Sequence, residues 1–162
     1  MPFVMMLFGT FSVCLFYFTT FSVENAVSQA SRAIRTGQYQ QGLGAYSSQA
    51  TDADRKKAFK QALCDKAPAH LDCDKAVVMV QSSSGGFGSI SPPTCATDGK
   101  LVDQSQAEFN PGKESSVVLV TVCYPWSSGA KLPFLDIGNT LADGSLLIQA
   151  SVAFRTEPYP GK

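Results

Sequence analysis

Residues 2–23, PFVMMLFGTFSVCLFYFTTFSV, contain no charged side chain. As an α-helix that rises about 1.5 Å per residue, this segment is long enough to cross a hydrocarbon core of roughly 30 Å. The sequence therefore predicts a single transmembrane anchor over residues 1–23, and the rest of the chain must be whatever that anchor holds at a membrane.

A cleaved secretory signal peptide is the alternative interpretation of this segment. Such signals carry a basic stretch before a short apolar core and end at a cleavage site made of small residues. No Lys or Arg precedes the apolar run, and no A-x-A sequence directly follows it. These features favour an anchor that is retained in the mature protein.

The charges of the chain balance and all lie after the apolar segment. Thirteen basic and thirteen acidic residues give a formal net charge of zero, and none of them precedes Glu24. No basic field is present that would attract nucleic acid, so we expect no nucleic-acid partner. Residues 38–162 have the length of one ordinary domain.

Cysteines are the second informative feature. Cys14 lies within the apolar segment, and four more lie in the soluble part: Cys64, Cys73, Cys95 and Cys123. Four cysteines allow three pairings, and the short separation favours a Cys64–Cys73 loop, which leaves the other two as the second pair. A zinc site is the rival reading, but it needs C-x-x-C spacing or several histidines. Disulfides would place the domain in an oxidising compartment outside the cytoplasm.

Basic residues near the anchor point to the opposite orientation. Arg32 and Arg35 follow the apolar segment and no basic residue precedes it. By the positive-inside rule this pattern favours a cytoplasmic domain. We give the cysteines more weight, and expect that basic residues belonging upstream of Met1 are missing from the sequence.

The helix is expected to continue beyond the membrane surface. Small and apolar residues recur there at the three- and four-residue spacing of one helix face: Val23, Ala26, Val27, Ala30, Ala33 and Ile34. Gly37 favours a helix end. Residues 24–37 are therefore predicted to be the extramembrane continuation of one helix, and its small residues indicate close packing against a β-sheet.

Residues 38–162 are predicted to form an α+β domain. Thr51 with Asp54 three residues later resembles a capping box, which predicts a short helix. Alternating apolar residues predict strands at 76–81, 116–124 and 145–155, with a weaker edge strand at 101–109. Composition indicates connecting segments at 37–50 and 82–93. The predicted architecture is pilin-like: a long N-terminal helix laid on an antiparallel sheet of three to four strands.

No catalytic constellation is apparent. His70 is the one histidine, and it lies between two cysteines in a Pro-containing turn, where a surface histidine is the simpler reading. Asp72 and Asp74 lie nearby without the glycine pattern of a calcium loop. We expect no metal, no cofactor and no small-molecule substrate. A membrane-anchored enzyme or ligand-sensing domain that depends on His70 or Asp72 is the alternative.

Two blocks of the sequence resemble a known family. Residues 23–40, VENAVSQASRAIRTGQYQ, and residues 146–159, LLIQASVAFRTEPY, resemble the TadE/TadG-like proteins of tight-adherence (Flp, type IVc) pilus systems. The Phe109-x-Pro111-Gly112 sequence before the central predicted strand also resembles that family. The likeness covers both ends of the chain and is weak over residues 41–100.

The resemblance implies a non-enzymatic minor pilin or pseudopilin that helps to assemble or prime the Flp pilus. It implies a single pass through the bacterial inner membrane with the C-terminal domain in the periplasm, and it allows incorporation into the pilus. The implied partners are membrane lipid, the pilin, other minor pilins and the inner-membrane platform. The family has a Gly-containing peptidase site upstream of the position of Pro2. We expect either that the start was assigned downstream of the true one or that this member is not processed.

Overall fold

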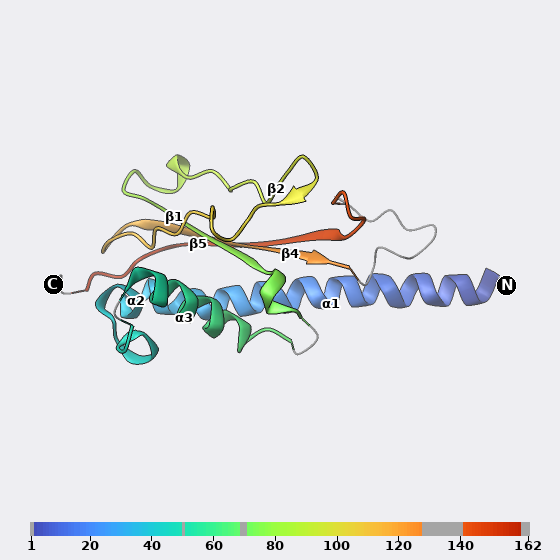
Figure 1. The fold of residues 1–162 in the computed structure, drawn as a ribbon, viewed down its shortest axis with the longest axis horizontal. Helices are drawn as coiled ribbons and strands as arrows, with labels where there is room; N and C mark the ends of the chain where they lie inside the picture. The colour runs from blue at the N-terminus through green and yellow to red at the C-terminus, as the bar shows by residue number, and fades with distance from the viewer. Residues whose placement is uncertain (1, 50, 69–70, 128–140, 160–162) are drawn as a thin grey trace.

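The structure, a computed structural model, describes residues 2–49, 51–68, 71–127 and 141–159. It is an α+β fold with a helical layer on one face of a small antiparallel sheet (Figure 1). The principal elements are α1 (Pro2–Arg35), α3 (Asp52–Cys64), β1 (Val77–Ser83), β4 (Val117–Trp126) and β5 (Leu146–Arg155). The helix α1 runs the length of the molecule, and its N-terminal end projects beyond the sheet.

The long helix ends where the sequence predicts. Gly37 has a φ of 75°, a left-handed conformation that glycine adopts without steric cost, and its N–H donates to the Ile34 carbonyl. A Cβ at this position would clash with the Tyr159 ring. Gly37 thus ends α1 and also lets the C-terminal segment pack against the helix end.

Residues 37–49, within the connecting segment expected at 37–50, are more ordered than their composition indicates. Two short helical turns, α2 (Gln38–Gln41) and η1 (Gly44–Tyr46), follow α1 directly. Tyr39 and Tyr46 are both 3% exposed, and their rings pack edge to face with centroids 5.2 Å apart. This segment is therefore part of the hydrophobic core.

The expected capped helix is present as α3. The Thr51 Oγ1 accepts a hydrogen bond from the Asp54 N–H at 3.1 Å, which satisfies one of the free donors at the helix start. Phe59 and Leu63 are fully buried on the face toward the core, while Ala62 is half-buried.

The sheet has the strand order β1-β4-β5, and both pairs are antiparallel. Each strand lies within one or two residues of its predicted range. Alternate residues of β4 face the helices, as the spacing indicated, and so do alternate residues of β5: Val118, Val120, Val122, Tyr124, Leu146, Ile148 and Ala150. Two-residue periodicity thus identified the core face correctly.

The weaker edge strand expected at residues 101–109 does not form. Only the two-residue strands β2 (Ala96–Thr97) and β3 (Lys100–Leu101) pair with each other, and Phe109 makes a single parallel bridge to Val80. The Gln104 side-chain amide lies where a strand would begin and hydrogen-bonds Val78 itself. At Val78, a side chain therefore makes the pairing that the prediction assigned to backbone, whereas Val80 pairs with the backbone of residues 108 and 110.

The other face of the sheet carries a second, smaller core of four buried residues beside Cys123: Val77, Met79, Cys95 and Ala107. The loop expected at 82–93 begins two residues late, because β1 continues through Ser83. It then makes a short turn, η3 (Phe87–Ser89), whose Phe87 is 60% exposed.

Replacing Ile34 tests the contact between α1 and the sheet. Ile34 is 0% exposed, so Ile34→Ala leaves a cavity and should lower the free energy of unfolding by about 3 kcal/mol. Trp126 is the single tryptophan and is buried, so its fluorescence can follow chemical unfolding of the full chain in detergent. Gln29→Ala, at an exposed site of the same helix, should change stability by less than about 0.5 kcal/mol. Equal effects of the two substitutions would contradict the packing described above.

Candidate interaction surface

One face of α1 packs against the sheet of the domain. The packing stripe expected from the sequence lies against β4 and β5, with Val23, Ala26, Val27, Ala30 and Ile34 at most 5% exposed. Ala33 is half-buried and also contacts this core. The small side chains of the stripe allow the helix to approach the sheet closely, which is the role that their spacing predicted.

The stripe starts earlier than the predicted membrane boundary. The centroids of the Phe16 and Trp126 rings are 5.4 Å apart, and Thr19 is 2% exposed. Part of the segment expected to be the anchor, residues 1–23, therefore packs on the domain.

Hydroxyl groups in this part of the helix are satisfied by the helix itself. Ser12, Thr19 and Thr20 donate to carbonyls one turn back at 2.8, 2.8 and 3.0 Å. Such bonds allow these side chains to lie in an apolar environment at little cost.

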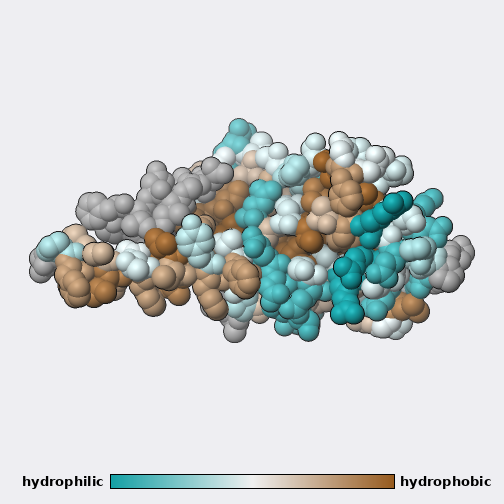
Figure 2. All heavy atoms as spheres, turned by 180° about the vertical axis from the view of Figure 1, so that it is seen from behind, coloured by the Kyte–Doolittle hydropathy of each residue, from teal (hydrophilic) through white to brown (hydrophobic). Residues whose placement is uncertain are grey.

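The opposite face of the same helix segment is bare and apolar. The large exposed side chains there include Phe3, Phe8, Phe11, Leu15, Tyr17 and Phe21, between 42% and 71% exposed. Figure 2 shows that mostly apolar, brown atoms form the projecting end of the molecule, and that most of the hydrophilic atoms lie on the domain. Free Cys14 is exposed on the same segment. A soluble monomer rarely exposes so large a contiguous apolar surface, so this face needs lipid or another protein.

The described residues contain one helix, Pro2–Arg35, that is long and apolar enough to cross a membrane. Only 6% of its most apolar window is buried inside the structure. The helix therefore differs from the core helix of a soluble protein, which would be covered on most sides.

Four aromatic rings form a cluster that the sequence analysis missed. Tyr39, Tyr46, Phe59 and Phe109 lie with ring centroids 5.2 to 6.2 Å apart in their contacting pairs. They come from four separate segments, so no local periodicity marks them. Beside the cluster is a surface cleft of about 410 Å³, which Arg55 and Gln40 also line.

Burial changes the acid–base behaviour of this cluster. Desolvation, with a smaller contribution from the nearby Asp52 carboxylate, raises the pKa of Tyr39 to about 12. Burial also raises the pKa of Tyr46. Both phenols therefore stay neutral at physiological pH and act as packing groups.

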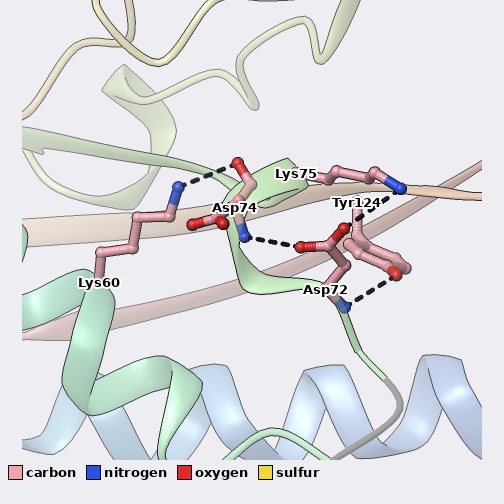
Figure 3. A network of polar contacts seen from close by, with 5 residues as sticks. All are labelled: Lys60, Asp72, Asp74, Lys75 and Tyr124. Carbon is pink, nitrogen blue, oxygen red and sulfur yellow. Dashed lines mark hydrogen bonds and ion pairs between the residues drawn. The ribbon is translucent and has the colours of Figure 1, made fainter.

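The acidic residues near His70 have local structural contacts. Asp72 accepts a hydrogen bond from the Asp74 N–H at 3.2 Å and pairs with the Lys75 ammonium at 3.2 Å (Figure 3). The Asp72 N–H donates to the Tyr124 hydroxyl at 3.2 Å, which joins this turn to the sheet. His70 itself lies outside the described residues. No cluster of three or more metal-ligating side chains occurs among the residues described.

The four soluble cysteines are paired as the spacing favoured. Disulfides join Cys64 to Cys73 and Cys95 to Cys123. The first closes the turn after α3, and the second ties the β2 segment to the central strand β4. Two cystines are typical of a protein in an oxidising compartment.

A basic groove runs between α1 and β5. Its helix side is formed by Ser28, Gln29, Ser31, Arg32 and Arg35, and its strand side by residues 152–154. The groove has a volume of about 340 Å³. The Ser31 hydroxyl at this junction is buried and has no hydrogen-bond partner among the described residues.

The end of the groove is closed by the C-terminal segment. The Glu157 N–H donates to the Arg35 carbonyl at 2.8 Å, and their side chains pair at 3.6 Å. Arg32 forms no ion pair with any residue in the described part of the chain. The helix side of the groove therefore carries an uncompensated positive charge.

Comparison with protein-family models, with curated proteins and with solved structures found no match.

The titration of Tyr39 should lower the free energy of unfolding at high pH. The unfolded phenol has an ordinary pKa near 10.0 and the folded one about 12, so the unfolded state loses its proton first. The stabilisation is complete below pH 10 and is lost as the pH rises from about 10 to about 12. Tyr39→Phe should flatten this decline, measured by chemical unfolding at a series of pH values. An unchanged slope would show that Tyr39 does not carry the effect.

The two disulfides should stabilise the fold unequally. They close loops with sequence separations of 9 and 28 residues. By loop entropy, replacing the Cys64–Cys73 pair with serines should cost about 2.5 kcal/mol, and replacing Cys95–Cys123 about 3.5 kcal/mol. Peptide mapping without reduction should recover both cystines. Recovery of any other pairing would refute the assignment.

Proposed function

We propose that the chain is a non-enzymatic, membrane-anchored minor pilin or pseudopilin that helps to assemble or prime a tight-adherence (Flp) pilus. Its α1 helix crosses the bacterial inner membrane once and its α+β domain lies in the periplasm. Its partners are lipid, the pilin, other minor pilins and the inner-membrane platform.

One observation carries this proposal: a single 34-residue helix packs against the domain with one face and exposes an apolar surface on the other. One face binds the domain as far down as Phe16, and the other face is bare and apolar from Phe3 to Phe21. The membrane anchor of an independent enzyme needs only to be apolar, and a flexible linker can join it to the enzyme domain. A rigid rod fused to its domain is suited to a subunit whose helix packs against other helices.

The two disulfides support a periplasmic location, because cystines persist in oxidising compartments. Arg32 and Arg35 are a weaker argument for the opposite orientation than the sequence indicated. Both belong to the folded domain, and long domains are translocated largely without regard to charge.

The packing at Phe16 also supports a domain that sits directly on the membrane. The first ring contact between α1 and the sheet is at Phe16, within the uncharged segment of residues 2–23, so little of the helix separates a membrane-spanning segment from the domain. Trp126, at the end of β4, would then lie at the interface, where tryptophan is favoured.

A ligand-sensing domain is the second candidate, and the cleft beside Tyr39 and Phe109 is the observation that favours it. Ala53 is exposed on α3 and lines this cleft. Ala53→Trp would fill the cleft without touching the helix rod. Under the pilin proposal, this variant should assemble pili normally.

The bare face of α1 provides the decisive test. Replacing Phe3, Phe8, Phe11 and Phe21 together by leucine keeps the span apolar and leaves the domain contacts intact. In a strain that lacks the native gene, this variant should give at least about tenfold fewer Flp pili by electron microscopy, because helix–helix packing depends on side-chain shape. His70→Ala and Ala53→Trp are the matched controls and should restore piliation, at equal protein levels by immunoblot. Normal piliation by the leucine variant, with loss on either control, would favour the enzyme or sensor.

A further inference from the structure

The two edges of the sheet differ, and the β1 edge is covered. The Val78 N–H donates to the Gln104 Oε1 at 2.8 Å, and the Gln104 side-chain amide donates back to the Val78 carbonyl at 3.1 Å. The Val80 N–H and carbonyl pair with residues 108 and 110 at 2.9 and 2.7 Å. These contacts satisfy the groups that an edge strand would otherwise present, and so protect this edge.

The β5 edge is open. The Thr156 N–H donates to the Ser116 carbonyl at 2.9 Å. The backbone N–H and C=O groups of even-numbered residues of β5 therefore point toward β4. In an antiparallel pair this alternation points the backbone N–H and C=O groups of Gln149, Ser151 and Ala153 away from the sheet. No hydrogen bond joins them to another segment among the described residues. Gln149, Ser151 and Ala153 are also exposed.

Positive charge lies along this open edge. Arg32 has no ionic partner in the described chain, and Arg35 is only partly offset by Glu157 at 3.6 Å. Arg155, at the end of β5, does not add to this charge, because its Nε donates to the Ser115 carbonyl on the β4 side. A strand placed beside β5 would lie over the groove of about 340 Å³ that Arg32 and Arg35 line.

The direction of the helix argues against an antiparallel pairing of two β5 edges. The start of β5 is opposite Trp126, which contacts Phe16, whereas Glu157 just after its end bonds the Arg35 carbonyl. The strand β5 therefore runs in the same direction as α1 (Figure 1). Antiparallel pairing would point the two anchors in opposite directions, which two copies with the same orientation in one membrane cannot do.

Other pairings with a second copy are also disfavoured. A parallel pairing of two β5 edges would bring the grooves with Arg32 and Arg35 of both copies to the same interface, and like charges repel. Head-to-tail pairing of β5 with β1 is blocked because Gln104 and residues 108–110 already occupy the β1 edge. The occupant must be a different segment with negative charge.

We propose that the open edge of β5 accepts an extended, acidic segment of a partner protein as a fourth strand, with its carboxylates at Arg32 and Arg35. Backbone hydrogen bonds to residues 149–153 give the affinity, and the arginines select the acidic sequence. The proposal rests on the fold and its orientation in the membrane, and it holds whether or not the chain serves a pilus.

Synthetic peptides can test this with the full chain in lipid nanodiscs. The probe is the acetylated peptide TVEVDVEVT, whose acidic residues share one face of a strand, and the control is TVKVKVKVT. The acidic peptide should slow amide hydrogen exchange at Gln149, Ser151 and Ala153 by at least about tenfold, and the lysine peptide should not. Equal protection by both peptides, or by neither, would overturn the proposal. Protection that rises with protein concentration alone would identify a second copy as the occupant instead.

Variants separate the backbone and charge components. Arg32→Glu should weaken binding of the acidic peptide about tenfold by fluorescence anisotropy and strengthen binding of the lysine peptide. Lys57→Glu, an exposed site on α3, is the matched control and should change neither. Ser151→Pro removes an outward N–H without disturbing β4, and should abolish binding of the acidic peptide. Trp126 fluorescence checks that each variant is folded, and folded variants that bind like the native chain would refute the site.

Discussion

The structure depends on the burial of one helix face against the sheet. Three strands cannot bury their own apolar surface, and α1 covers β4 and β5 through a stripe of small and branched side chains. Ile34 and Val27 at one end and Phe16 at the other mark the extent of this contact. This contact also fixes the domain relative to the one described helix that is long and apolar enough to cross a membrane, because the two are the same helix.

The second constraint is that the helix is shared between two environments. Its sheet-facing side uses hydroxyls that bond to its own carbonyls, so Ser12 and Thr19 fit equally well beside protein or lipid. Its other side carries large aromatic groups that nothing in the described chain covers. The domain and the apolar helix are therefore one packed unit and not two parts joined by a linker, which suits the proposed assembly subunit.

Most of the fold could be predicted because its signals are local. The uncharged segment, the stripe that ends at Gly37 and the two-residue alternation in β4 and β5 are each visible within a short window of sequence. The rest depends on contacts between distant segments. The aromatic cluster joins Tyr39 to Phe109, and Gln104 protects the β1 edge with a side chain, so neither leaves a periodic trace. The open edge of β5 could not be inferred either, because a strand pattern does not say which edge will be covered.

The parallel course of α1 and β5 also has a mechanical consequence. A force that pulls the N-terminal end of α1 along its axis acts along the length of β5 and not across it. Contacts from Phe16 to Ile34 are then strained together, whereas a perpendicular pull would open them one after another. The Glu157–Arg35 hydrogen bond and the Tyr159 ring at Gly37 hold the far end of the same interface. The domain is thus arranged to resist shear, the direction in which a fibre or a membrane would load it.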